Sequence, residues 1–135
     1  DDPRLTTRDW EGMNCDIYIL SKKGFQKDYK IFKQESRVTI LNNQKIDFGK
    51  DVVKQICENL YDDKILSIIV EGGTKTLSNF INSETWDEIR VFKTKEKLVD
   101  GIIGPNIKFE ESKKIEIGDN ELVCYVNKGV TFFNI

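Results

Sequence analysis

Histidine is absent from this chain of 135 residues. Its absence removes the commonest general base of enzymes, the serine–histidine pair of hydrolases and most kinds of zinc site. Any chemistry must therefore use carboxylates, hydroxyls, cationic side chains, backbone groups or a bound cofactor.

Cysteine is scarce as well, and Cys15, Cys57 and Cys124 lie far apart in the sequence. Their separations match neither the short spacings of metal sites nor a redox pair. We expect three reduced thiols, as is usual in a cytoplasmic protein, and no metal site.

The chain also lacks a surplus of either charge and any long apolar run. It has 21 basic and 23 acidic residues, for a formal net charge of −2, which argues against nucleic acid as a partner. No apolar run approaches the roughly 18 residues that span a bilayer, so no membrane association is expected. Hydrophobic residues make up 39% of the chain, which allows the core of one domain. These features predict a soluble, cytoplasmic domain.

Hydrophobic periodicity predicts an α/β protein. Expected helices cover 49–64 and 74–83, where apolar residues recur on one face. Expected strands cover 15–20, 37–41, 65–70, 88–94, a hairpin at 113–126 around the turn "GDN", and a short last strand at 130–135. The nearly all-apolar run 65–70 predicts an inner strand of a parallel sheet, covered on both faces. The hairpin predicts an antiparallel edge, which is a plausible surface for pairing with a second copy.

Two glycines separate the predicted inner strand from the next helix, in "IIVEGGTKTLSNF" (68–80). Gly72 and Gly73 allow the backbone to approach an anion, and the helix start offers unpaired N–H groups and a positive dipole end. Lys75 adds a cation nearby, and Thr74 and Thr76 add hydroxyls. The pattern is neither a P-loop nor the dinucleotide fingerprint GxGxxG, and a simple tight turn is the alternative interpretation.

Glu71 stands directly after the apolar run, so its carboxylate is expected at the rim of the core, where it needs partners. It could cap its own turn, pair with a cation or hold the hydroxyls of a ligand. The residues alone leave these three roles open.

Two motifs resemble a known family. "SIIVEGGTKTLSNFINSETWDEIRVF" resembles the signature of the reductase domain of bifunctional riboflavin-biosynthesis deaminase/reductases, and "DDPRLTTR" at the start is similar to a second motif of that family. The resemblance is good over 1–20 and 64–107 and weak elsewhere. It implies a dihydrofolate-reductase-like mixed sheet with flanking helices. The family domain is longer at its front, so we expect 1–135 to be the C-terminal portion of one reductase domain, starting in mid-domain and lacking its first strands. The zinc motifs of a deaminase (H-x-E and P-C-x-x-C) are absent, so no deaminase domain is expected.

The resemblance also implies a function and a site. The family uses NADPH to reduce the ribosyl group of a phosphorylated aminopyrimidine, 5-amino-6-(5-phosphoribosylamino)uracil, to a ribityl chain. Substrate contacts are implied for Leu5, Arg8 and Glu71, and Glu71 is the implied catalytic residue facing the ribose. The implied cofactor-binding residues are Asp1, Gly72, Gly73, Thr74, Lys75, Thr76, Leu77, Ser78 and Asn79.

Two alternatives remain open at this point. One is a related pyrimidine or dihydrofolate-like reductase with another substrate. The other is a non-catalytic domain that binds NADP or mediates dimer contacts. A homodimer is the expected assembly.

Overall fold

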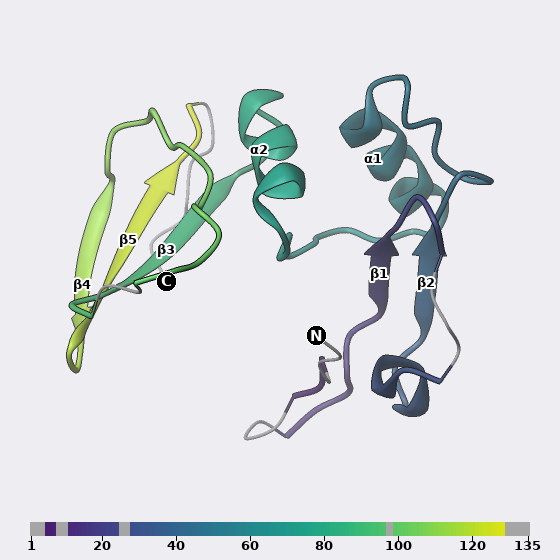
Figure 1. Ribbon diagram of the computed structural model, residues 1–135, viewed down its shortest axis with the longest axis horizontal. Coiled ribbons are helices and arrows are strands. Elements are labelled where there is room, and N and C mark those ends of the chain that lie inside the picture. The colour runs from purple at the N-terminus through teal and green to yellow at the C-terminus, as the bar shows by residue number, and fades with distance from the viewer. Residues whose placement is uncertain (1–4, 8–10, 25–27, 97–98, 129–135) are drawn as a thin grey trace. The chain divides into compact units, whose positions relative to one another are not determined.

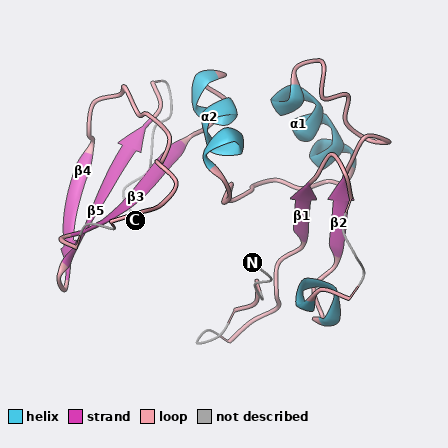
Figure 2. Cartoon of the chain, viewed as in Figure 1, coloured by secondary structure: helices cyan, strands magenta, loops and turns pink. Residues whose placement is uncertain are grey.

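The computed structural model describes residues 5–7, 11–24, 28–96 and 99–128. The chain divides into two compact units, the first ending at Leu66 and the second beginning at Ser67. The strands within the described residues form two sheets, one in each unit (Figures 1 and 2). The strand predicted at 130–135 lies outside the described residues.

The first unit contains a pair of parallel strands, β1 (Ile17–Leu20) and β2 (Val38–Leu41). Their register runs from Ile17 opposite Val38 to Leu20 opposite Leu41. Parallel neighbours need a long connection, and here it includes a short 3₁₀ helix, η1 (Lys30–Lys33). Both strands were predicted, and both are rich in the β-branched residues that favour a pleated surface.

Helix α1 (Val52–Asp62) follows β2 and has defined ends. The Asp51 carboxylate accepts a hydrogen bond from the Lys54 N–H at 3.0 Å, which satisfies one of the free donors of the first turn. Lys64 takes a left-handed conformation with φ of 60°, and the Ile65 N–H donates a hydrogen bond to the Leu60 carbonyl. This pattern is a Schellman-type stop. The helix predicted at 49–64 is therefore confirmed, within two or three residues at each end.

The core of the first unit combines the apolar face of α1 with the two strands. Its buried side chains are Ile17, Ile31, Leu41, Ile46, Val53, Ile56 and Leu60. At the surface, Arg37 Nη2 donates to the Tyr18 hydroxyl at 2.8 Å, and that hydroxyl donates to Asp63 at 2.7 Å. Partial burial and the bond to Asp63 raise the pKa of Tyr18. These bonds link β1, the residue before β2 and the end of α1.

The prediction of a buried inner strand at 65–70 is wrong. The segment has no strand assignment, and its largest side chains are open to solvent, with Leu66 100% and Ile69 88% exposed. An apolar run expresses a preference for burial, but a strand exists only where a neighbour pairs with its backbone. Among the described residues no strand pairs with this segment. The expectation that Glu71 lies at the rim of a core fails for the same reason, because Glu71 is exposed.

The second unit begins with α2 (Thr74–Asn82) and continues into β3 (Glu88–Thr94), β4 (Lys113–Ile117) and β5 (Asn120–Val126). The three strands form an antiparallel sheet in the order β3-β5-β4, so β5 is central. Val123 of β5 is fully buried, and Phe80 and Ile81 of α2 are also buried. The helix at 74–83, the strand at 88–94 and the hairpin at 113–126 are all confirmed. Neither α1 nor α2, the α-helices of the described part of the chain, has the length and apolar character that crossing a membrane requires.

A tight turn and a β-bulge shape this second sheet. Gly118 has φ of +57°, as a tight two-residue turn between β4 and β5 requires. The Ser112 N–H donates to the Cys124 carbonyl at 2.8 Å, although Cys124 is already paired with Lys113. Two residues of one strand thus face one residue of the other, which is a β-bulge just before β4.

Candidate functional site

The start of α2 presents free backbone donors. Gly73 is the residue before the first helical position, with φ of −63° and ψ of 155°, and it has no side chain to cap the helix. Its carbonyl accepts from the N–H groups of Thr76 at 3.0 Å and Leu77 at 3.3 Å. The N–H groups of Thr74 and Lys75 donate to no other described residue. Two donors at the positive end of a nine-residue helix are therefore available to an anion.

The two glycines leave the approach to these donors open. A Cβ built on Gly72 or on Gly73 would meet no atom within 4 Å. Gly72 has φ of +141°, a conformation that residues with side chains rarely adopt. Gly72, Gly73 and Lys75 are all exposed. The helix start is thus not packed beneath other described side chains, and a ligand can reach its backbone.

A loop distant in sequence is held against the helix start. The Thr74 hydroxyl donates to the Ile103 carbonyl at 2.6 Å, across 29 residues of sequence. The sequence predicted only a loop here, punctuated by Gly101, Gly104 and Pro105. The bond places the backbone around Ile103 beside the first turn of α2. No local sequence pattern specifies this contact. In the structure Gly104, like Gly72 and Gly73, has no atom within 4 Å of an added Cβ.

The side chains of α2 divide into two faces. Thr74, Leu77 and Ser78 lie at i, i+3 and i+4 and are half-buried. Lys75 and Asn79, four residues apart, are exposed on the same side of the helix. A ligand lying along the first two turns would meet Lys75 and Asn79 directly.

Glu71 precedes the glycine pair, and its carboxylate is exposed. No hydrogen bond or ion pair to another described residue engages it, so two of the roles left open by the sequence, a cap and an ion pair, are not taken up. The carboxylate is free for a ligand.

The remaining predicted residues belong to the first unit or lie outside the description. Leu5 is 38% exposed, which excludes an ordinary core role. Asp1 and Arg8 lie outside the described residues. The contiguous run from Glu71 to Asn79 is therefore the part of the predicted site that the structure brings together.

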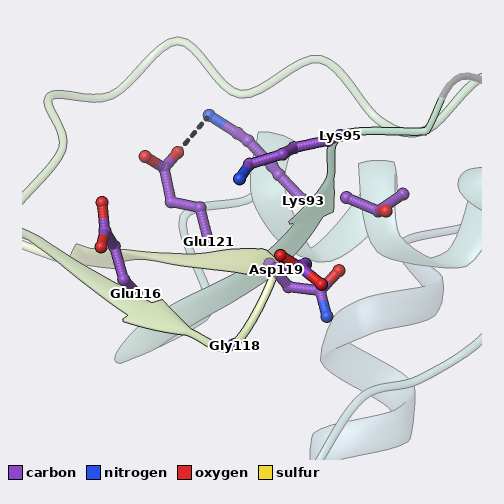
Figure 3. A pocket seen from close by; sticks show the side chains of 8 residues that line it. Lys93, Lys95, Glu116, Gly118, Asp119 and Glu121 are labelled. Atoms are coloured by element: carbon purple, nitrogen blue, oxygen red, sulfur yellow. Dashed lines mark ion pairs between the residues drawn. The ribbon is translucent and has the colours of Figure 1, made fainter.

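A separate depression lies at the turn of the β4–β5 hairpin. It is lined by Lys93, Thr94, Lys95, Glu116, Gly118, Asp119, Asn120 and Glu121 (Figure 3). It contains none of the residues that the sequence assigned to the cofactor or the substrate. Its mixed charges give no reason to place the cofactor there.

The two glycines are expected to differ in what they contribute to stability. Gly72→Ala forces a side chain into the conformation at φ of +141° and should lower the free energy of unfolding by about 1–2 kcal/mol. Gly73→Ala keeps a backbone that any residue adopts and should change it by about 0.5 kcal/mol or less. Urea unfolding of both variants measures the difference. Equal losses would show that the backbone at Gly72 is not specific to glycine.

Comparisons with known proteins find similarity to proteins of riboflavin biosynthesis. A family model described as the RibD C-terminal domain matches residues 1–94. No curated protein sequence matches this chain.

Two solved structures are similar to it. The first is a diaminohydroxyphosphoribosylaminopyrimidine deaminase/5-amino-6-(5-phosphoribosylamino)uracil reductase from Thermotoga maritima, with a TM-score of 0.76 and 26% identity over 94% of this chain. The second is a protein named for riboflavin biosynthesis from Shewanella sp. PV-4, with a TM-score of 0.63 and 18% identity over 90% of this chain, a likeness of fold alone. This chain spans 42% of the first protein and 64% of the second. The first match confirms the predicted α/β class of the dihydrofolate-reductase-like type.

Proposed function

Because this chain belongs to the RibD C-terminal domain family, we propose that it carries the reductase step of riboflavin biosynthesis. The reaction is the NADPH-dependent reduction of the ribosyl group of 5-amino-6-(5-phosphoribosylamino)uracil to a ribitylamino group. The Thermotoga maritima protein is named as a reductase of that compound. The observation that carries the proposal for this chain is the open amide end of α2 behind Gly72 and Gly73.

The residues at this end fit the phosphates of a dinucleotide. The free N–H groups of Thr74 and Lys75 offer hydrogen bonds to phosphate oxygens, and the helix dipole favours the negative charge. The Lys75 side chain adds a full positive charge on the exposed face. The lack of a Cβ at Gly72 and Gly73 allows close backbone contact. We assign Gly72 to Asn79 to NADPH, with Leu77 and Ser78 supporting the helix from its half-buried face.

A nicotinamide in its reduced form would supply a hydride, which a histidine-free chain cannot generate from its own side chains. The remaining work falls to the protein. The open-chain form of the ribosylamine has a C1=N bond, so reduction adds a hydride at C1 and a proton from solvent at nitrogen. Positive charge on that C=N group makes C1 a better acceptor.

Glu71 is assigned to this reacting end of the substrate. Its unpaired carboxylate can accept hydrogen bonds from the ribose hydroxyls and can stabilise positive charge at the C=N group. Its position directly before Gly72 places it next to the residues assigned to the cofactor. Leu5 and Arg8 are assigned to the substrate on the sequence motif, because a guanidinium suits a substrate phosphate.

A direct assay of NADPH oxidation tests the proposal. The 135-residue chain is mixed with NADPH and 5-amino-6-(5-phosphoribosylamino)uracil, and the loss of reduced-nicotinamide absorbance is followed together with ribitylamino product. Product formation supports the proposal. Oxidation only with another pyrimidine or with dihydrofolate would replace the substrate, and NADPH binding without turnover on any of them would make the chain a non-catalytic binding domain.

A further inference from the structure

The loop between β3 and β4 carries two adjacent isoleucines that are almost fully open to solvent. Ile102 is 90% exposed and Ile103 is 88% exposed. Residues 99–108 form no helix or strand, and a glycine flanks the pair on each side in the sequence "GIIG" (101–104). A single exposed apolar residue is common on protein surfaces, whereas two adjacent ones form a small patch that a ligand can cover.

This segment, residues 101–104, is here called the GIIG loop, and one hydrogen bond attaches it to another element of the second unit. The Thr74 hydroxyl donates to the Ile103 carbonyl at 2.6 Å, and no other hydrogen bond or ion pair joins the loop to a described element. The next anchor along the chain is Phe109, whose ring meets that of Trp86 edge-on, with 4.9 Å between centroids. Few buried contacts and a single external bond are features of a segment that moves when a ligand binds.

Thr74 connects the GIIG loop to the proposed phosphate site. Its N–H is one of the two free donors at the start of α2, and its hydroxyl holds the Ile103 carbonyl. The Ile103 side chain branches from the Cα next to that carbonyl, so it begins close to the Thr74 hydroxyl. A ligand bound to the Thr74 N–H therefore lies near the base of the Ile103 side chain.

The two surfaces complement the two chemical parts of a dinucleotide. Its phosphates are anionic and suit the helix start with its lysine, whereas the rings on either side of the pyrophosphate have flat apolar faces. The helix start itself offers no apolar contact to a ring, because Lys75 and Asn79 are polar and the two residues before the helix are glycines. Ile102 and Ile103 supply the contact that is missing there.

We propose that the GIIG loop is a lid for the bound dinucleotide. On binding, Ile102 and Ile103 pack against one of the two rings, and the Thr74 hydroxyl keeps the loop at the site through the Ile103 carbonyl. This closure removes apolar surface of both partners from water and excludes water from the bound cofactor. The inference rests on the proposed function, because its ligand is the NADPH assigned to α2.

Calorimetric titration of the 135-residue chain with NADPH tests the isoleucine contact. Ile102→Ser and Ile103→Ser should each raise the Kd about five- to tenfold, because each variant loses an apolar contact made only with the ligand. Both side chains are exposed, so their loss should not destabilise the fold. Val99→Ser is the matched control, since Val99 is fully exposed just before the loop, and it should leave the Kd within about twofold.

Titration with 2′,5′-ADP shows which ring the lid covers. An equal loss of affinity for 2′,5′-ADP in the two isoleucine variants assigns them to the adenine. Parental affinity for 2′,5′-ADP, together with weakened NADPH binding, assigns them to the nicotinamide.

Thr74 acts here as a positioning residue, and coupling between variants tests that role. Thr74→Val keeps the backbone N–H and removes the hydroxyl, so it should raise the Kd of NADPH about fivefold, whereas Thr74→Ser keeps a hydroxyl and should stay within about twofold. Because Thr74 acts through the loop, Thr74→Val combined with Ile103→Ser should bind within about twofold of the weaker single variant. Losses that multiply in the double variant would contradict this role.

Hydrogen exchange followed by NMR measures closure directly. The N–H groups of Ile102, Ile103 and Gly104 donate to no other described residue, so they should exchange rapidly in the free chain. Saturating NADPH should slow their exchange at least about threefold. The amides of Gly118 and Asp119, in the hairpin turn, should be unaffected.

Two results separate this inference from the function on which it rests. A parent chain that does not bind NADPH would overturn both. NADPH binding by isoleucine variants with parental affinity, or without slower exchange in the GIIG loop, would overturn the lid and leave the proposed function intact. Circular dichroism establishes that each variant is folded.

Discussion

Glu71→Gln should lower turnover of the aminopyrimidine ribosyl phosphate about a hundredfold and leave NADPH affinity within about threefold. The substitution keeps the size of the side chain and removes its charge. The Glu71 carboxylate has no ion pair or hydrogen bond with another described residue, so its removal should not destabilise the fold. Loss of the negative charge should slow turnover, because the carboxylate stabilises the positive charge that develops on the substrate. Steady-state kinetics for turnover and titration calorimetry for NADPH separate the two effects.

A matched control is available for this variant. Glu110 is an exposed glutamate of the second unit that forms no ion pair with another described residue. Glu110→Gln makes the same change of charge and should leave both turnover and affinity unchanged. Unaltered turnover in Glu71→Gln, or a loss of NADPH affinity as large as the loss of turnover, would contradict the role given to Glu71.

Gly73→Val should weaken NADPH binding at least about thirtyfold. The backbone at Gly73 suits any residue, and an added Cβ meets no protein atom within 4 Å, so the fold should accept the valine. The new methyl groups would occupy the space in front of the Thr74 and Lys75 N–H groups. A phosphate could then no longer approach within hydrogen-bond distance of both.

Calorimetric titration with NADPH and with 2′,5′-ADP measures this loss for the whole cofactor and for its phosphate-bearing half. Ser83→Val, at the other end of α2, is the control and should bind both ligands like the parent. Thermal unfolding shows whether each variant is folded. A folded Gly73→Val protein with parental affinity would place the phosphates elsewhere.

Local sequence signals predicted most elements of this fold. The spacing of Val53, Ile56 and Leu60 marks the buried face of α1, and Gly118 in the sequence "GDN" marks the hairpin turn. Each of these features acts within a few residues, so the sequence carries it directly. Hydrophobic content alone misled at 65–70, because the run indicates a need for burial without specifying the strand that pairs with it.

The candidate site could be predicted as far as it is contiguous. Glu71 to Asn79 form one segment, and the glycine pair and the helix period place them together. The bond from Thr74 to Ile103 spans 29 residues, and no local pattern specifies a contact at that separation. The exposure of Glu71 was missed because it depended on the strand predicted before it. The division of the strands into two sheets likewise depends on pairing between distant segments.

The central claim is that the open amide end of α2 holds the phosphates of a dinucleotide. Its most direct test is an NMR titration of the ¹⁵N-labelled chain with NADPH, following backbone amides. The account predicts that the largest shifts fall on Gly73, Thr74 and Lys75, with Asn82 and Ser83 at the other end of the helix unmoved. Shifts confined to other segments, or none at saturating NADPH, would contradict it.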